Sequence, residues 1–132
     1  MKIRNGFVSN SSSSSFIILL DKMTNEQKII IYNHIDIAAN IDKKLISEGK
    51  VPVYEYYDEW ILKEDDFSLW CYTAMDNFNL IGFICKEVKL PRKSIILFGE
   101  GYWYELYMDP KYIKMKTDYL RSKKLNKIID KL

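Results

Sequence analysis

The sequence predicts an α+β fold, with one mixed, mainly antiparallel sheet of about four to six strands and three helices. Short apolar runs such as Phe16–Leu20 are typical of buried strands. Longer stretches, among them 25–48 and the one that begins at Pro110, carry apolar side chains at helical spacing. The chain has 132 residues, of which 48% are hydrophobic and 29% charged. We therefore expect a single globular domain over 1–132, with one core.

The strands are predicted from short apolar or ring-rich runs. Phe16–Leu20 is five consecutive apolar residues ended by Asp21, the pattern of a strand buried on both faces. Leu69–Thr73 is rich in aromatic and β-branched side chains, which favour strands. The other segments predicted to be extended are Lys2–Val8, Val51–Tyr57, Glu59–Lys63, Ser94–Phe98 and Tyr102–Tyr107, with turns near Asp58 and at Gly99–Gly101.

The first helix is predicted over 25–48, with a break around His34–Asp36. Thr24 and Gln27 have the spacing of a capping box, in which each side chain bonds the other residue's amide. Gly49 is a natural left-handed stop.

The second helix is expected to begin at Asp76 and to end at Pro91. The third begins at Asp109-Pro110, because Asp is a good N-cap and Pro suits the first helical position. Its predicted apolar face comprises Tyr112, Met115, Tyr119, Leu125, Ile128, Ile129 and Leu132.

Charge is unevenly distributed along the chain, although the net charge is only +2. Residues 111–132 carry eight Lys or Arg and two Asp, so this segment is net +6 and the remainder is net −4. The basic segment and the acidic central region could attract each other, which would explain both. The acidic residues of the central region are Glu55, Asp58, Glu59, Glu64, Asp65 and Asp66.

Several classes of protein are disfavoured by composition. Cys71 and Cys85 are the two cysteines and His34 is the one histidine, so no disulfide framework, metal site or cofactor is predicted. A serine run stands where the apolar core of a signal peptide would be, and no apolar run is long enough to cross a membrane. We expect a cytoplasmic protein that does not associate with membranes, and we make no prediction of its oligomeric state.

The leader MKIRNGFVSNSSSSSFII resembles one shared by small uncharacterised proteins of tailed bacteriophages and bacterial mobile elements. A later segment, Thr73–Phe78, is similar to a Ser-Met-Asp-Asn-Phe step in some of them, with Ala74 as a departure. The resemblance implies a phage or mobile-element accessory protein, and therefore a bacterial host cell as its location. It brings no reaction, ligand or catalytic residue with it. The matching leader residues are Asn5, Gly6, Phe7, Val8, Ser9, Asn10, Ser11–Ser15 and Phe16.

Three interpretations of the serine tract Ser9–Ser15 stay open. The first is a structured connection or strand integral to the domain, because serine hydroxyls bond nearby backbone. The second is an anion site, although a phosphate loop would need more glycines, a lysine and a following helix. The third is a tag read by a processing or packaging factor. The first is favoured, because a strand-like run follows directly at Phe16.

No catalytic motif stands out from the sequence. Gly99-Glu100-Gly101 follows a predicted strand, but Tyr104 occupies the third glycine position of a dinucleotide loop, so a turn is favoured. The acidic residues lack the spacing of a calcium loop. Cys71 and His34 would form a nucleophile pair only by accident of the fold. An enzyme is therefore the least favoured class.

Two functions remain as hypotheses. The first is a non-enzymatic accessory protein that binds a host or viral protein, for example to inhibit a host defence or takeover target. Its contact residues would be Tyr54, Tyr56, Tyr57, Trp60 and Trp103, since aromatic side chains dominate protein interfaces. The alternative is a nucleic-acid-associated protein, in which Trp103 stacks on bases and basic side chains bind phosphate. Those basic residues would be Arg121, Lys123, Lys124 and Lys127.

Overall fold

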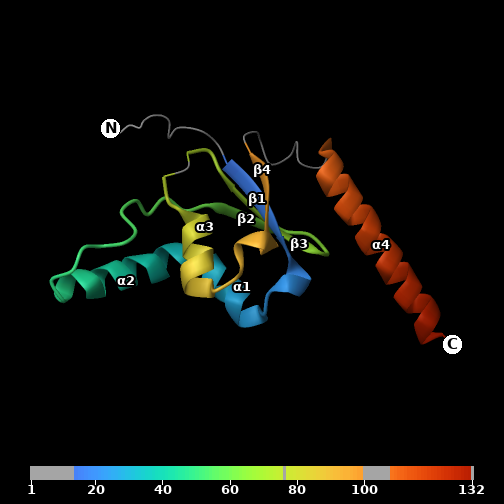
Figure 1. Ribbon diagram of the computed structural model, residues 1–132, viewed down its shortest axis with the longest axis horizontal. Helices are drawn as coiled ribbons and strands as arrows, with labels where there is room; N and C mark the ends of the chain where they lie inside the picture. The colour runs from blue at the N-terminus through green and yellow to red at the C-terminus, as the bar shows by residue number, and fades with distance from the viewer. Residues whose placement is uncertain (1–13, 76, 100–107, 132) are drawn as a thin grey trace. The chain divides into compact units, whose positions relative to one another are not determined.

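The computed structural model describes residues 14–75, 77–99 and 108–131 (Figure 1). The chain forms two compact units, Met1–Gly101 and Tyr102–Leu132. In the described residues the first unit holds one antiparallel sheet of four strands, and the chain has four α-helices. The α+β class and the mainly antiparallel sheet are therefore confirmed, whereas the expected number of three helices is too low. The single domain over 1–132 stays a prediction.

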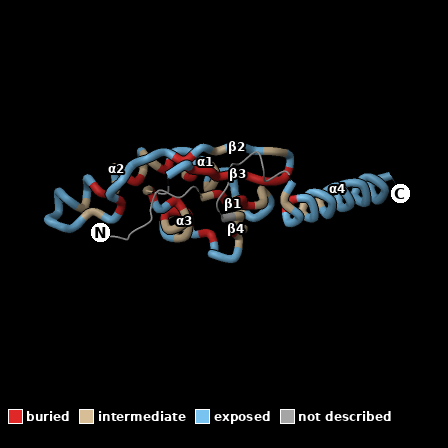
Figure 2. The backbone as a smooth tube through the Cα atoms, turned by 90° about the horizontal axis from the view of Figure 1, so that it is seen from above, coloured by how far each residue is buried: buried red, intermediate tan, exposed pale blue. Residues whose placement is uncertain are grey.

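The sheet has the strand order β2-β3-β1-β4, and every neighbouring pair is antiparallel. Its two central strands are β1 (Ser14–Leu19) and β3 (Ser68–Thr73). All six residues of β3 are buried, as are the four central residues of β1. Figure 2 shows this burial along the sheet. The strand predicted near Phe16–Leu20, with both faces buried, is confirmed as β1, and the strand predicted over Leu69–Thr73 is confirmed as β3. The outer strands are β2 (Ile61–Glu64) and β4 (Ile95–Gly99).

Alternate residues of the central strands build the main core. Phe16 of β1 lies opposite Cys71 of β3, and Ile18 lies opposite Leu69. These four side chains are almost completely buried, in one cluster with apolar residues of the helices. Each such side chain removed from water contributes about 1.5–3 kcal/mol to stability. The cluster also contains Ile31, Ala38, Tyr54, Trp60, Phe78, Leu80, Phe83, Ile84, Val88, Leu90 and Ile95.

The predicted first helix is two helices, α1 (Asn25–Tyr32) and α2 (His34–Ser47). Thr24 and Gln27 form the expected capping box, with hydrogen bonds of 3.1 and 2.8 Å. The break expected around His34–Asp36 falls at Asn33, whose side-chain amide donates to the Ile29 carbonyl at 2.9 Å. Gly49 follows with φ of 76°, a conformation that glycine adopts without strain. The capping, the break and the stop are all confirmed.

The predicted second helix begins later than expected. Asn79, rather than Asp76, caps α3 (Leu80–Phe83), and its side-chain oxygen accepts the Gly82 amide at 2.9 Å. A Cβ at Gly82 would lie 2.6 Å from the Asn79 amide nitrogen, so the cap depends on a glycine there. The chain continues as a single wide helical turn, η3 (Ile84–Val88). Asp76 lies outside the described residues.

The strand predicted over Val51–Tyr57 is wrong. Residues 51–60 form neither a helix nor a strand, because the amides of Val53 and Tyr54 donate to a carboxylate of α2 instead of a neighbouring strand. Two other predicted extended segments correspond to strands. The segment predicted over Glu59–Lys63 corresponds to β2, and the one predicted over Ser94–Phe98 matches β4 to within one residue. Lys2–Val8, Tyr102–Tyr107 and the rest of the turn after Gly99 lie outside the described residues.

The second unit contains α4 (Pro110–Asp130). As predicted, Asp109 caps it, and its carboxylate accepts the Lys111 amide at 2.8 Å. The single apolar face predicted for this helix is wrong. The apolar side chains near the start of the helix and those near its end point in different directions. At about 3.6 residues per turn, the two directions differ by roughly a third of a turn around the helix axis. The first group is Tyr112, Met115 and Tyr119, and the second is Leu125, Ile128 and Ile129.

The two groups on α4 also differ in burial. Tyr112 is buried and Met115 and Tyr119 are half-buried, whereas every residue from Leu120 to Lys131 is exposed. Within the described ranges, no helix combines the length and the apolar character needed to cross a lipid bilayer.

Candidate functional site: an anchored acidic and aromatic segment

Segment 51–60, with the sequence VPVYEYYDEW, is joined by hydrogen bonds to one face of α2. His34, Ala38 and Asp42 are the buried residues of that helix. Their spacing of four places them along a single stripe, which we call the anchor stripe. Two of its three members are polar, and both bind segment 51–60. The segment is therefore held by the helix that precedes it in the chain.

Asp42 holds the first half of the segment. One carboxylate oxygen accepts the Val53 amide at 2.7 Å, and the other accepts the Tyr54 amide at 3.0 Å. The hydroxyl of Tyr57 also donates to this carboxylate. Burial disfavours the charged form, but the hydrogen bonds that Asp42 accepts outweigh it, so the pKa of Asp42 lies below its usual value. The bond to Asp42 raises the pKa of Tyr57 to about 12.

His34 holds the end of the segment. Its Nδ1 lies 2.7 Å from the Ile31 carbonyl, and its Nε2 lies 3.1 Å from the Trp60 amide nitrogen. A carbonyl accepts and an amide donates, so the ring is neutral with its proton on Nδ1. Burial lowers the pKa of His34, consistent with the neutral form.

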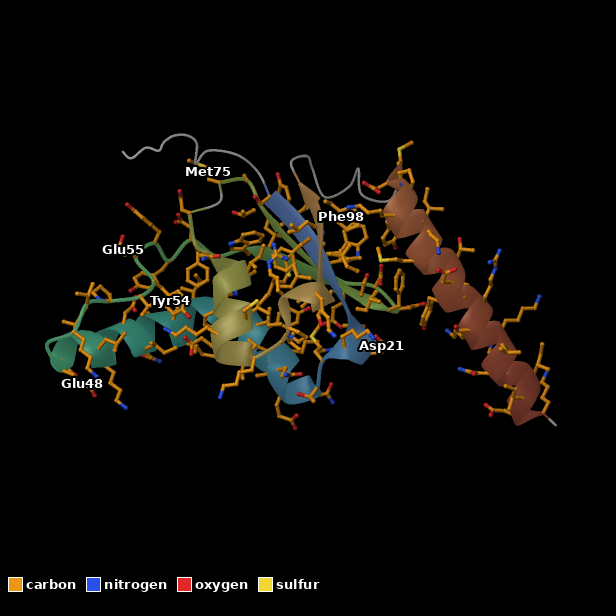
Figure 3. All side chains as sticks on the ribbon, viewed as in Figure 1. Asp21, Glu48, Tyr54, Glu55, Met75 and Phe98 are labelled. Atoms are coloured by element: carbon orange, nitrogen blue, oxygen red, sulfur yellow. The ribbon has the colours of Figure 1, made fainter. Side chains whose placement is uncertain are left out.

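Two aromatic side chains of the segment enter the core. The indole of Trp60 donates to the Phe78 carbonyl at 2.9 Å, and its ring lies 5.4 Å from that of Phe16. The ring of Tyr54 stacks on that of Phe78 at 5.6 Å, and its hydroxyl donates to Glu87 at 2.6 Å. Figure 3 shows Tyr54 beside α3. Both side chains therefore fix the segment and are not part of an exposed surface.

The outward side of the segment carries two tyrosines and three carboxylates. Tyr56 and Tyr57 are 61% and 40% exposed, although the Tyr57 hydroxyl is tied to Asp42. Glu55, Asp58 and Glu59 are exposed as well, and Asp58 accepts the side-chain amide of Asn77 at 3.0 Å. Segment 51–60 contains no Lys or Arg, so every charged side chain of the segment is acidic.

A cleft of about 190 Å³ lies beside this surface. Its walls come from the segment and from the loop before α3, and the stacked rings of Tyr54 and Phe78 are among them. The remaining lining residues are Val53, Glu55, Tyr56, Asn77 and Asn79.

Two of the other acidic residues have structural roles. Glu64 accepts hydrogen bonds from Lys28 at 3.0 Å and from Tyr32 at 2.7 Å, linking β2 to α1. Asp65 accepts the amides of Phe67 and Ser68 at 3.0 and 2.8 Å, within the turn between β2 and β3. Glu64 and Asp65 are therefore engaged in contacts within the fold, and the sixth acidic residue of the central region, Asp66, is exposed.

The structure separates the five residues predicted to contact a protein partner. Tyr54 and Trp60 are buried in the core, Tyr56 and Tyr57 are exposed, and Trp103 lies outside the described residues. The nucleic-acid prediction places its residues on α4, and all four are exposed: Arg121, Lys123, Lys124 and Lys127.

The structure describes only the last residues of the leader, from Ser14 onwards. Ser14, Ser15 and Phe16 lie in β1, and Ser15 and Phe16 are buried. The other leader residues lie outside the described residues: Asn5, Gly6, Ser9, Asn10 and Ser11.

His34 is not placed to activate a thiol, because its ring nitrogens contact Ile31 and Trp60. Burial raises the pKa of Cys71, which disfavours the reactive thiolate. Among the described residues, no group of three or more His, Cys, Asp or Glu side chains could hold a metal ion.

Sequence reasoning did not identify Asp42 and His34 as anchors. Asp42 interrupts the apolar stripe of a helix, where Ala38 precedes it by one turn. A carboxylate on the buried side of a helix needs hydrogen-bond partners, and this was the available signal.

Comparison with known proteins gave no match: no family model, no curated protein and no solved structure matches this chain.

Proposed function

We propose that this protein is a non-enzymatic accessory protein that binds a basic surface of another protein through the outward side of segment 51–60. One observation carries the proposal: an irregular segment is fixed by buried hydrogen bonds to Asp42 and His34 while Tyr56 and Tyr57 face outward. The leader resemblance adds that the partner is a host or viral protein of a phage-infected bacterial cell.

The anchoring of the segment favours recognition. Ordering a loop on binding costs free energy, about 1–2 kcal/mol for each residue whose backbone becomes fixed. The Val53, Tyr54 and Trp60 amides are already hydrogen-bonded, so little of this cost remains. Tyrosine adds a large contact area at low cost in side-chain entropy.

The charge of the segment indicates the chemistry of the partner. Glu55, Asp58 and Glu59 surround the exposed rings, with no basic residue in the segment. Lysine and arginine side chains would pair with these carboxylates, and arginine would also stack on tyrosine. Association should therefore slow as salt is added, because screening weakens attraction between opposite charges.

The size of the cleft supports a protein partner over a small ligand. Sites for drug-sized ligands usually occupy about 300–1,000 Å³, more than the 190 Å³ beside Tyr54 and Phe78. A space of this size suits one side chain inserted by a partner, an arrangement common at the energetic centres of interfaces.

The test starts by capturing partners from host lysate with the full chain and then measuring affinity for the purified partner. Tyr56→Ala removes an exposed ring with no role in the core, and we expect it to weaken binding at least about tenfold. Ile29→Ala is the matched control, because Ile29 is similarly exposed, at 59%, on α1 of the same unit. We expect the control to bind like the wild type.

The charge is tested separately with Glu55→Gln/Glu59→Gln. This variant should bind more slowly and lose much of the salt dependence of the association rate. A partner that binds both variants as tightly as it binds the wild-type chain would refute the proposed surface.

A further inference from the structure

The distal half of α4 with the residue that follows it, 121–131, presents a second exposed surface, which we call the distal half of α4. Leu125, Ile128 and Ile129 are 56%, 51% and 55% exposed. Their spacing of three and four residues places them on one face of the helix. Figure 2 shows the exposure of this half of the helix. Isolated exposed apolar residues are common, but three on one helical face form a patch that indicates a contact.

The same part of the helix carries five basic side chains in addition to the apolar trio. Lys123, Lys127 and Lys131 follow each other at intervals of four and lie on the side of the helix away from it. Arg121 and Lys124 lie closer to the trio. Asp130 is the one acidic residue of the distal half. The surface therefore combines an apolar stripe with strong positive charge.

Neither a lipid bilayer nor a nucleic acid accounts for this combination well. Interfacial helices insert broad apolar faces, often with Trp or Phe, and the distal half has three apolar residues and no aromatic one. Binding to phosphates would use the lysines and leave Leu125, Ile128 and Ile129 in water. A protein groove that is apolar inside and acidic at its rim would contact the trio together with Arg121 and Lys124.

We propose that the distal half of α4 docks as a helix into an apolar groove rimmed by carboxylates on a partner protein. Leu125, Ile128 and Ile129 are the anchors, matching the spacing by which amphipathic helices fill such grooves. Arg121 and Lys124, which lie on the side of the trio, pair with the rim and set the orientation. This docking does not rest on segment 51–60, which is acidic and fits a basic surface instead.

The probe is calcium-loaded calmodulin, which opens an apolar, methionine-rich groove for basic amphipathic helices. It stands in for the groove and is not the proposed partner. Titration of the full chain into calmodulin should show micromolar binding with calcium, abolished by EDTA.

The apolar anchors are tested by Leu125→Gln/Ile129→Gln, which should weaken binding at least about tenfold. Ile113→Gln is the matched control, because Ile113 is 50% exposed on the same helix but outside the distal half. Circular dichroism of each variant should show unchanged helix content, so that lost affinity reflects lost contacts.

Three results would overturn the proposal. One is the absence of calcium-dependent binding. Another is affinity that Lys123→Gln/Lys127→Gln abolishes and Leu125→Gln/Ile129→Gln leaves unchanged, since only charge would then matter. The third is tighter binding to duplex DNA or to phosphatidylserine vesicles than to calmodulin, which would assign the helix to nucleic acid or to membranes.

Discussion

Segment 51–60 and the distal half of α4 both expose apolar side chains beside charge, yet they are held in opposite ways. Segment 51–60 has no regular backbone structure, and long-range hydrogen bonds to Asp42 and His34 fix it. The distal half of α4 has regular helical hydrogen bonds and no buried residue. Regular secondary structure is therefore a poor guide to which surface is tied to the core.

The difference predicts different responses to mutation. Changes at the anchors of segment 51–60 should unfold part of the molecule, because the anchors are buried and shared with the core. Changes in the distal half of α4 should alter binding alone.

The largest effect is expected for Asp42→Ala. This change removes the acceptor for the amides of Val53 and Tyr54, and a buried donor without a partner costs about 1–3 kcal/mol. We expect the free energy of unfolding in urea to fall by about 2–5 kcal/mol. Asn40→Ala, at an exposed position of α2, should change it by less than about 0.5 kcal/mol. Equal losses in both variants would argue against the anchor.

A smaller loss is expected for Trp60→Phe. The variant cannot donate to the Phe78 carbonyl, and the smaller ring leaves space beside Phe16. We expect a loss of about 1–3 kcal/mol in unfolding free energy. Tyr56→Phe, in the same segment but exposed, should be nearly neutral. A neutral Trp60→Phe would show that the end of the segment is not fixed by the core.

Acid should reduce the stability that His34, the second anchor of segment 51–60, contributes to the fold. The pKa of His34 is lowered by burial, so the unfolded chain takes up this proton more readily than the folded one. The contribution of His34 to stability is complete above its pKa in the unfolded chain, about 6.5. That contribution is lost as the pH falls towards the lower pKa of His34 in the folded chain. Chemical denaturation should therefore show stability declining below about pH 6.5, before the carboxylates protonate.

The control for this pH dependence is His34→Gln, which removes the titrating ring. The decline between about pH 6.5 and 5 should be shallower in this variant. Below that range both proteins should lose stability together, because Asp42 and Glu64 have lowered pKa values and their hydrogen bonds fail on protonation. The same slope in both proteins would assign the acid sensitivity to other groups.

The smallest effect is expected on α4. Leu125→Gln/Ile129→Gln changes two exposed side chains, and Gln forms helices at least as well as Ile. We expect the unfolding free energy to stay within about 0.5 kcal/mol of the wild type. A large loss would mean that the trio is covered in the folded molecule.

Local signals in the sequence predicted much of the fold. Thr24 and Gln27 marked the start of α1, Gly49 marked the end of α2, and Asp109-Pro110 marked the start of α4. Apolar runs located the central strands. These features depend on residues close together in the chain, so a sequence pattern can reveal them.

The candidate site was predicted only in part. Of the residues predicted to contact a partner, Tyr56 and Tyr57 are exposed, whereas Tyr54 and Trp60 are core residues. Val51–Tyr57 looked like a strand because apolar and ring side chains are frequent there. Its conformation is decided by Asp42, which precedes Val53 by eleven residues and belongs to another element, so no local pattern reports it.

The most direct test of the anchoring is amide hydrogen exchange of the native protein. The amides of Val53, Tyr54 and Trp60 should be strongly protected although they lie outside any helix or strand. The amides of Lys124–Lys127 should exchange faster, because no burial protects the distal half of α4 from local opening. Rapid exchange at Val53, Tyr54 and Trp60 together with slow exchange at Lys124–Lys127 would contradict the account.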